Sequence, residues 1–260
     1  MPFAELNDVR LYVRQEGSGP VALFIHGFPF DSTMWIEQLS ALSSVRRCVA
    51  VDLRGFGYSS PATGEPLTME QHAADLAGVL DLMSEERADI IGLSMGGYVA
   101  LAFAERYPDR MRSLALLDTR ASADSEESKA GRDAMAQRVI AEGRQALAAT
   151  MQDALLAPSA SSAARARLRT MIESCPYETI IGALAGMRDR PDRTSVLGSI
   201  TVPTMVIVGA EDRVTPPADA ARMAEAIPGA TLVTIPAAGH LTPVEQPAAV
   251  GDALAELLPR

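Results

Sequence analysis

Short apolar runs recur along the chain and predict the strands of a buried sheet. Each run is too short for a helix and ends near a glycine, an aspartate or a turn. Continuous apolar runs of this length are typical of strands that are buried on both faces of a parallel sheet. The predicted strands are Val21–Ile25, Cys48–Val51, Ile90–Gly92, Leu114–Leu117, Met205–Val208 and Leu232–Ile235.

Segments with helical periodicity separate most of these runs. Thr68 and Gln71 fit a capping box, which predicts a helix that runs towards Met83. Strands that alternate with helices imply right-handed crossovers and a parallel sheet covered by helices on both faces. Alternating residues at the start of the chain predict a hairpin at the sheet edge, Phe3–Leu6 and Val9–Arg14. Further helices are predicted over residues 94–107, 217–227 and 243–258.

One long segment breaks the alternation of strands and helices. Residues 121–199 contain no convincing strand, but they carry helical stripes such as Met135, Val139 and Ile140. A chain of 260 residues with 48% hydrophobic composition can bury one large core. We therefore expect a single α/β domain over residues 1–260, with residues 121–199 inserted as a helical cap.

Composition narrows the class of partner. The formal net charge of −10 disfavours binding to nucleic acid or to anionic lipid surfaces, because both would repel the protein. The N-terminal residues lack the pattern of a secretory signal, and no apolar run is long enough to span a bilayer. We expect a soluble cytoplasmic protein that acts on a small molecule; the sequence predicts no oligomeric state.

The two cysteines do not indicate a disulfide or a metal site. Cys48 and Cys175 lie far apart in sequence, and neither belongs to a CxxC motif or a Cys/His cluster. We expect both to be buried free thiols and predict no metal.

A glycine-rich turn supplies the candidate nucleophile. The segment Gly92–Gly97 follows a predicted strand, precedes an apolar helix and carries Ser94 in a GxSxG pattern. This strand-turn-helix context holds a serine hydroxyl above the sheet, where helix amides favour developing negative charge. The alternative is a turn in which Ser94 only caps the helix.

A serine needs a base, and the chain offers His26, His72 and His240. His72 falls in the first turn of the helix that begins near Thr68, where we expect a surface position. His26 directly follows a strand. His240 follows the last predicted strand, at the same carboxyl edge as Ser94, and is our candidate base.

The base in turn needs a carboxylate to fix its tautomer. Glu211 and Asp212 both follow the strand Met205–Val208, and Asp118 ends the strand before it. We prefer Asp212 to Asp118, and Asp118 to Glu211, while each could simply be a turn or capping residue.

An oxyanion hole requires two fixed amides near the nucleophile. The backbone amides of Met95 and Phe28 are the candidates, because Met95 follows Ser94 and Phe28 lies in the loop after a central strand. His26 would shape this loop by hydrogen bonding, or be purely structural.

Several segments together resemble the α/β-hydrolase superfamily, in particular its esterase, lactonase and peroxidase-like branch. The matching segments are His26–Pro29, Asp52–Ser59, Gly92–Gly97, Gly209–Pro216 and Gly239–Pro243 with Glu245 and Pro247. The resemblance implies an eight-stranded, mostly parallel sheet flanked by helices, a helical cap after strand six, no cofactor, and the acid at Asp212. It implies a structural role for Asp52–Ser59, and Ser94 stands where epoxide hydrolases and haloalkane dehalogenases carry aspartate, which disfavours those activities.

The expected substrate is a carboxylic ester with a short or medium acyl chain, hydrolysed through an acyl-enzyme. Alternatives with the same triad are an enol-lactone, a carbon–carbon bond in a diketone, or perhydrolysis; the segment His26–Phe30 does not resemble the enol-lactonase loop. A different class is a non-catalytic small-molecule receptor. An apolar pocket is predicted, joined by Met and Leu residues of the cap and lined by Phe28, Phe30, Trp35, Met95, Val214 and Leu241.

Overall fold

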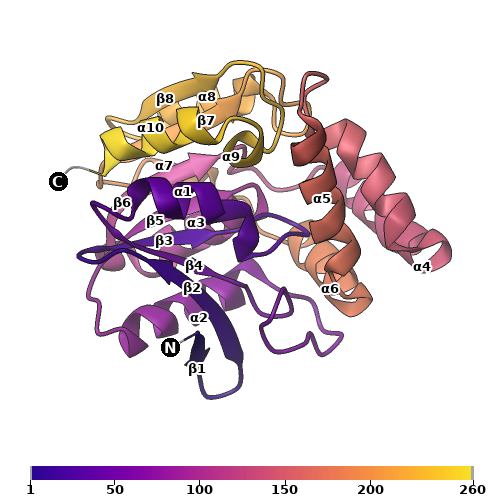
Figure 1. The fold of residues 1–260 in the computed structure, drawn as a ribbon, viewed down its shortest axis with the longest axis horizontal. Helices are drawn as coiled ribbons and strands as arrows, with labels where there is room; N and C mark the ends of the chain where they lie inside the picture. Colours follow the sequence, from indigo (N-terminus) through magenta and orange to yellow (C-terminus); the bar gives the residue numbers. More distant parts are fainter. Residues whose placement is uncertain (1, 259–260) are drawn as a thin grey trace.

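A computed structural model describes residues 2–258 and contains one eight-stranded sheet (Figure 1). The strand order is β1-β2-β4-β3-β5-β6-β7-β8. Strand β2 runs antiparallel to both of its neighbours, and the pairs from β4 to β8 are parallel. The strands are β1 (Phe3–Glu5), β2 (Arg10–Glu16), β3 (Val21–Ile25), β4 (Arg47–Val51), β5 (Ala88–Leu93), β6 (Met111–Leu117), β7 (Thr204–Gly209) and β8 (Thr231–Ile235).

Helices cover both faces of this sheet. Helix α2 contacts α3, α3 contacts α7 (Thr194–Leu197) and α7 contacts α8, whereas α1 contacts α10 in front of the sheet in Figure 1. The helices outside the segment between β6 and β7 are α1 (Ile36–Leu42), α2 (Met69–Leu82), α3 (Met95–Arg106), α8 (Pro217–Ala226), α9 (Thr242–Glu245) and α10 (Pro247–Leu257), with short 3₁₀ turns at Ser32–Trp35 and Pro108–Arg110. The chain therefore has the eight-stranded, mostly parallel sheet and flanking helices expected of an α/β hydrolase fold.

Four helices lie between β6 and β7. They are α4 (Glu126–Leu155), α5 (Ser162–Ser174), α6 (Tyr177–Arg188) and α7 (Thr194–Leu197). Helix α4 contacts α5 and α6, and these three, which we call the cap helices, stand together beside the sheet in Figure 1. Helix α4 is interrupted at Gly143, whose φ of 83° and ψ of 176° are not helical.

The parallel register brings the carboxyl ends of β3, β5, β6, β7 and β8 to one edge of the sheet. Ile25 pairs with Gly92 between β3 and β5, and Leu93 pairs with Leu117 between β5 and β6. Gly209 pairs with Ile235 between β7 and β8. The loops after these strands consequently emerge side by side, as carboxyl ends of parallel strands do.

The predicted helix boundaries hold at Thr68 but not after residue 242. The predicted helix at Thr68 is confirmed, because the Thr68 hydroxyl accepts a hydrogen bond from the Gln71 amide at 3.2 Å. The predicted helix over 243–258 is two helices, α9 and α10, because Gln246 precedes Pro247 and such a residue disfavours helical backbone. Helix α1 was not predicted.

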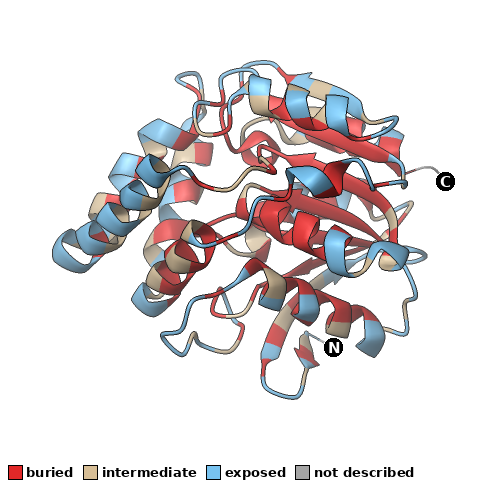
Figure 2. Ribbon diagram, turned by 180° about the vertical axis from the view of Figure 1, so that it is seen from behind, coloured by how far each residue is buried: buried red, intermediate tan, exposed pale blue. Residues whose placement is uncertain are grey.

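The prediction that the last strand is buried on both faces is wrong. β8 is the edge strand, and Leu232 on it is 41% exposed. Figure 2 shows how burial is distributed instead: the inner strands and the helix α3 are buried, whereas α4 is largely exposed. Among residues 2–258, no helix has the length and apolarity needed to cross a membrane.

Candidate active site

Ser94 sits on a sharp turn between β5 and α3. Its φ of 53° and ψ of −113° are unusual for a residue with a side chain. A Cβ added at Gly92 would lie 2.3 Å from the Gly96 carbonyl oxygen, and one at Gly96 would lie 2.2 Å from the Ile25 carbonyl oxygen. Both positions therefore require glycine, and the turn lifts Ser94 above the sheet edge.

His240 joins Ser94 to Asp212 through two hydrogen bonds. Its Nε2 atom is 2.8 Å from Ser94 Oγ, and its Nδ1 atom is 2.8 Å from Asp212 Oδ2. Asp212 is fixed in turn: its Oδ1 accepts from the amides of Val214 and Thr215, and its Oδ2 accepts from the Thr215 hydroxyl at 2.7 Å. The structure thus brings together the three residues predicted as nucleophile, base and acid.

Burial and charge have opposite effects on the pKa values of His240 and Asp212. Burial lowers the pKa of His240, but the charge and hydrogen bond of Asp212 outweigh it and raise the pKa above its ordinary value. Burial raises the pKa of Asp212, while His240 and Thr215 hold it below the usual range. An ionised Asp212 can therefore stabilise a proton on His240 when Ser94 gives one up.

Asp118, the second candidate acid, faces other partners. Its Oδ1 accepts from the Gly209 amide at 2.9 Å, and its Oδ2 accepts from the Thr242 hydroxyl at 2.5 Å. Burial raises the pKa of Asp118 to about 8, so it is largely protonated at neutral pH. Asp118 therefore joins β7 to the loop after His240 without contacting the imidazole. Glu211, the third candidate acid, is exposed.

The loop that carries Phe28 passes beside the nucleophile. A Cβ added at Gly27 would lie 3.4 Å from Ser94 Cβ and 2.8 Å from the Leu93 side chain. His26 holds this loop, because its Nδ1–H donates to the Gly27 carbonyl at 2.9 Å and its Nε2 accepts from the Leu53 amide at 3.0 Å. Burial lowers the pKa of His26, which suits this neutral role in shaping the loop.

The surface position predicted for His72 is wrong. His72 is fully buried in α2, its ring lies 6.4 Å from that of Phe56, and neither ring nitrogen has a hydrogen-bond partner among the described residues. Burial lowers its pKa to about 3. The signal for burial was present in the sequence, since His72 shares a helical stripe with Met69 and Leu76.

A cavity of about 150 Å³ opens beside Ser94 and His240. Phe28 and Val214, both predicted as substrate-binding, line it. The other lining residues come from α3, α4 and α6: Tyr98, Arg132, Met135, Met151, Ala154, Leu155 and Met187. The cap methionines were anticipated as a group, whereas Tyr98 and Arg132 were not predicted.

The remaining predicted pocket residues belong to the core. Phe30, Trp35, Met95 and Leu241 are at most 2% exposed and do not line the cavity. Trp35, for example, packs against Phe24 with ring centroids 5.3 Å apart. Apolar residues near a catalytic motif are also the residues that a buried sheet needs, so sequence cannot separate the two uses.

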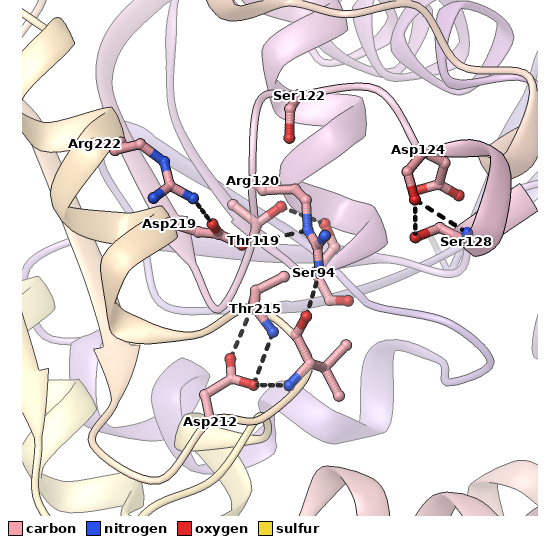
Figure 3. A network of polar contacts seen from close by, with 12 residues as sticks. Ser94, Thr119, Arg120, Ser122, Asp124, Ser128, Asp212, Thr215, Asp219 and Arg222 are labelled. Carbon is pink, nitrogen blue, oxygen red and sulfur yellow. Dashed lines mark hydrogen bonds and ion pairs between the residues drawn. The ribbon is translucent and has the colours of Figure 1, made fainter.

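A polar network joins the segment after β6 to the turn that carries Ser94 and to the loop that carries Asp212 (Figure 3). The Thr119 hydroxyl donates to the Ser94 carbonyl at 2.8 Å. The neighbouring Arg120 guanidinium donates to the Val214 carbonyl, and the Val214 amide donates to Asp212 at 2.8 Å. One loop after β6 therefore supports both Ser94 and Asp212.

The end of α4 is attached to the loop that carries His240. The His240 amide donates to the Leu155 carbonyl at 2.7 Å. The Glu245 carboxylate accepts from the Ala157 amide at 2.7 Å and from the Gly239 amide at 2.9 Å. Arg213, next to the acid, donates to the Asp153 carbonyl at 2.7 Å.

The model of the alpha/beta hydrolase fold family matches residues 20–247. The chain belongs to the alpha/beta hydrolase fold family. The matched residues include Ser94, His240 and Asp212, the candidate nucleophile, base and acid. The family is the one that the sequence motifs resemble.

Solved structures of other alpha/beta hydrolases are similar over nearly the whole chain. A thermophilic esterase from Thermogutta terrifontis is 42% identical, with a TM-score of 0.93 over 96% of this chain and 93% of the esterase. The enol-lactonase from Burkholderia xenovorans LB400 is 29% identical, with a TM-score of 0.90 over 99% of both chains.

Curated relatives have more varied activities. The 2-hydroxymuconate semialdehyde hydrolase of a Pseudomonas species is 29% identical over 95% of this chain and 91% of its own length. A dihydrolipoyllysine-residue acetyltransferase component of the acetoin cleaving system from Cupriavidus necator is 30% identical over 94% of this chain, and the match spans only 65% of that protein. The family accordingly establishes a hydrolase fold and leaves the substrate open.

Metal ligands are not grouped in the described part of this alpha/beta hydrolase. Among residues 2–258, no three His, Cys, Asp or Glu side chains could hold a metal ion together. Cys48 and Cys175 are buried and free, as predicted, and burial raises the pKa of each to about 12. Such protonated thiols are poor metal ligands and poor nucleophiles.

Proposed function

We propose that this protein is a serine esterase that hydrolyses small carboxylic esters through an acyl-enzyme on Ser94. The observation that carries the proposal is the continuous hydrogen-bonded series from Asp212 through His240 to Ser94, at the wall of a cavity of about 150 Å³. A serine in this setting is an activated nucleophile, because a neutral imidazole accepts its proton as it attacks.

The first half-reaction forms the acyl-enzyme. Ser94 Oγ attacks the ester carbonyl carbon while His240 Nε2 takes the hydroxyl proton. The carbonyl oxygen becomes an oxyanion, for which the amides of Phe28 and Met95 are the proposed donors. Collapse of the tetrahedral intermediate breaks the bond to the alcohol oxygen, which leaves with the proton from His240.

The second half-reaction releases the acid. A water molecule gives a proton to His240 and attacks the acyl carbon, and the second intermediate then expels Ser94 Oγ, which recovers the proton. Asp212 remains ionised throughout and stabilises the imidazolium form of His240. Its lowered pKa supports this role.

Cavity size supports a short acyl chain. A space of about 150 Å³ is comparable to an apolar cavity that holds one benzene molecule. Most of the lining residues are apolar, three methionines among them, which favours an aliphatic acyl group. The esterase from Thermogutta terrifontis, at 42% identity, supports ester hydrolysis as the first activity to test.

A lactone is the second candidate substrate. The enol-lactonase from Burkholderia xenovorans LB400 has nearly the same length and a TM-score of 0.90. A lactone is a cyclic ester, so Ser94 would attack it in the same way, with the alcohol and acid remaining in one product.

The test compares wild type with Ser94→Ala on p-nitrophenyl esters of increasing acyl length. We expect wild type alone to release nitrophenol above a no-enzyme control, with an optimum at short chains. Labelling of Ser94 by a phosphonate without ester turnover would direct the search to lactones and diketones. Absence of both turnover and labelling would refute the esterase and favour a non-catalytic small-molecule receptor.

A further inference from the structure

The cavity beside Ser94 is asymmetric in charge. Among its lining residues within the described chain, the groups that carry positive charge are Arg132 and, when protonated, His240, and no carboxylate lines it. The rest of the wall is apolar apart from Ser94 and Tyr98. A guanidinium in such surroundings is poorly solvated, so an anion placed beside it would interact strongly.

Arg132 belongs to a cluster with more positive than negative groups. Its Nε donates to Asp124 Oδ2, and its Nη2 lies 3.4 Å from Asp124 Oδ1. The same carboxylate accepts from Arg190 Nη1 at 2.7 Å. Two guanidinium groups therefore share the Asp124 carboxylate within this hydrogen-bonded cluster.

The two arginines of this cluster differ in how their donors are used. Arg190 is buried, donates to the carbonyls of Met187 and Ser122, and stacks over the Tyr98 ring at 3.9 Å. The Arg132 side chain is 21% exposed, and within residues 2–258 its Nη1 donates only to the Met187 sulfur, a weak acceptor, at 3.4 Å. Strong donor capacity therefore remains on Arg132, which lines the cavity.

The small volume connects Arg132 to the reaction. Ser94 and Arg132 line the same space of about 150 Å³, so a ligand that is bonded to Ser94 and fills the space must touch Arg132. During the reaction the acyl part stays on Ser94 while the alcohol leaves. In the acyl-enzyme, therefore, a group that Arg132 contacts in this space belongs to the acyl chain.

We propose that Arg132 binds a carboxylate on the acyl part of the substrate, so that the preferred esters are monoesters of short dicarboxylic acids. This inference rests on the proposed esterase function and adds a substrate class to it. A guanidinium offers two parallel donors to a carboxylate, and such charge-assisted pairs are stronger than neutral hydrogen bonds.

The test uses two esters of nearly the same shape. Monoethyl succinate carries a terminal carboxylate, and ethyl 4-oxopentanoate carries a neutral acetyl group in its place. We expect Arg132→Met to lower the ratio of kcat/KM for the anionic ester to that for the neutral ester by about 10- to 100-fold. Arg132→Lys, which keeps the charge without the fork, should lower the ratio less.

Arg138→Met is the matched control. Arg138 lies on the same helix, pairs with Glu142 on the surface and does not line the cavity. Its substitution should leave the ratio unchanged. A ratio that is the same in wild type and Arg132→Met, or that changes equally in Arg138→Met, would overturn the inference.

A binding measurement separates this inference from the esterase proposal. Calorimetry should show that the Ser94→Ala variant binds monoethyl succinate more tightly than ethyl 4-oxopentanoate. This difference in affinity should be lost in the double variant Ser94→Ala, Arg132→Met. If wild type hydrolyses neither ester but this Arg132-dependent binding is found, the esterase function fails and the anion site stands. Binding that does not depend on Arg132 overturns the anion site, whether or not wild type hydrolyses the esters.

Discussion

The two walls of the active site are built differently. On the sheet side, Ser94 lies within a turn in which Gly92 and Gly96 leave no room for a Cβ, and the helix α3 that follows is buried along most of its length. On the cap side, α4 is mostly exposed and contributes methionines and Arg132. Methionine side chains adapt their shape easily, whereas a glycine turn does not. The comparison suggests that the sheet determines the reaction and the cap determines the substrate.

The largest effect is expected at the nucleophile. Ser94→Ala should lower kcat by roughly 10⁶-fold, as loss of the serine does in other triads, because no other group can form the acyl-enzyme. Circular dichroism and thermal unfolding should match those of wild type. Substantial residual hydrolysis by the purified variant would mean that Ser94 is not the attacking group.

The two buried aspartates on the sheet side should respond very differently. Asp212→Asn should lower kcat by up to roughly 10⁴-fold, because an amide cannot stabilise the His240 imidazolium and favours the wrong tautomer. Asp118→Asn should have a much smaller effect, because Asp118 does not contact the imidazole. The opposite order in kcat would assign the acid to Asp118.

The pH dependence of kcat/KM should report the state of His240. The base works only when neutral, and its pKa is raised above the ordinary 6.5, so activity should fall as pH decreases through a midpoint above 6.5. Removing the Asp212 charge should move this midpoint to lower pH. A wild-type midpoint below 6.5 would contradict the raised pKa.

A substitution in the cap should alter selectivity more than the reaction. Met151→Ala enlarges the cavity beside Ser94, so kcat/KM for a hexanoate ester should rise relative to that for an acetate ester by about 10-fold. Rates measured over a series of acyl lengths would check this. If all chain lengths changed by the same factor, Met151 would not contribute to the choice of acyl chain.

Protonation of His72 should lower the free energy of unfolding without changing either wall of the active site. Its pKa is about 3 in the folded protein and about 6.5 in the unfolded chain, so the unfolded state binds more protons as pH falls below 6.5. Between pH 6.5 and 5 this should cost wild type roughly 1–2 kcal/mol of unfolding free energy. His72→Leu should remove that part of the loss, as urea unfolding at the two pH values would measure, while His26 acts equally in both proteins.

The sequence was informative where chemistry depends on local pattern. A strand, a glycine turn and an apolar helix located Ser94, and the ends of two later strands located Asp212 and His240, because parallel strands present their carboxyl ends together. The central strands were also predictable from local pattern, because a sheet covered on both faces needs continuous apolar runs.

Features that depend on tertiary contacts were not predictable. The edge position of β8 follows from the strand order, which the apolar pattern of Leu232–Ile235 does not encode. Trp35 and Leu241 are apolar residues close to functional motifs, but packing assigns them to the core. In the sequence, Arg132 cannot be distinguished from the other charged residues of a polar helix. Only the fold shows that it lines the cavity.

The attachment of α4 beside His240 gives the cap a fixed pivot. A rigid displacement of the whole helix would break the hydrogen bond between the His240 amide and the Leu155 carbonyl and so disturb the base. A bend at Gly143, whose backbone already departs from the helix, would leave that hydrogen bond intact. Arg132 lies on the other side of Gly143 from this pivot. Because Arg132 is itself held through Asp124 to the buried Arg190, a bend at Gly143 would leave both the proposed anion site and the catalytic residues in place while the helix between them moves.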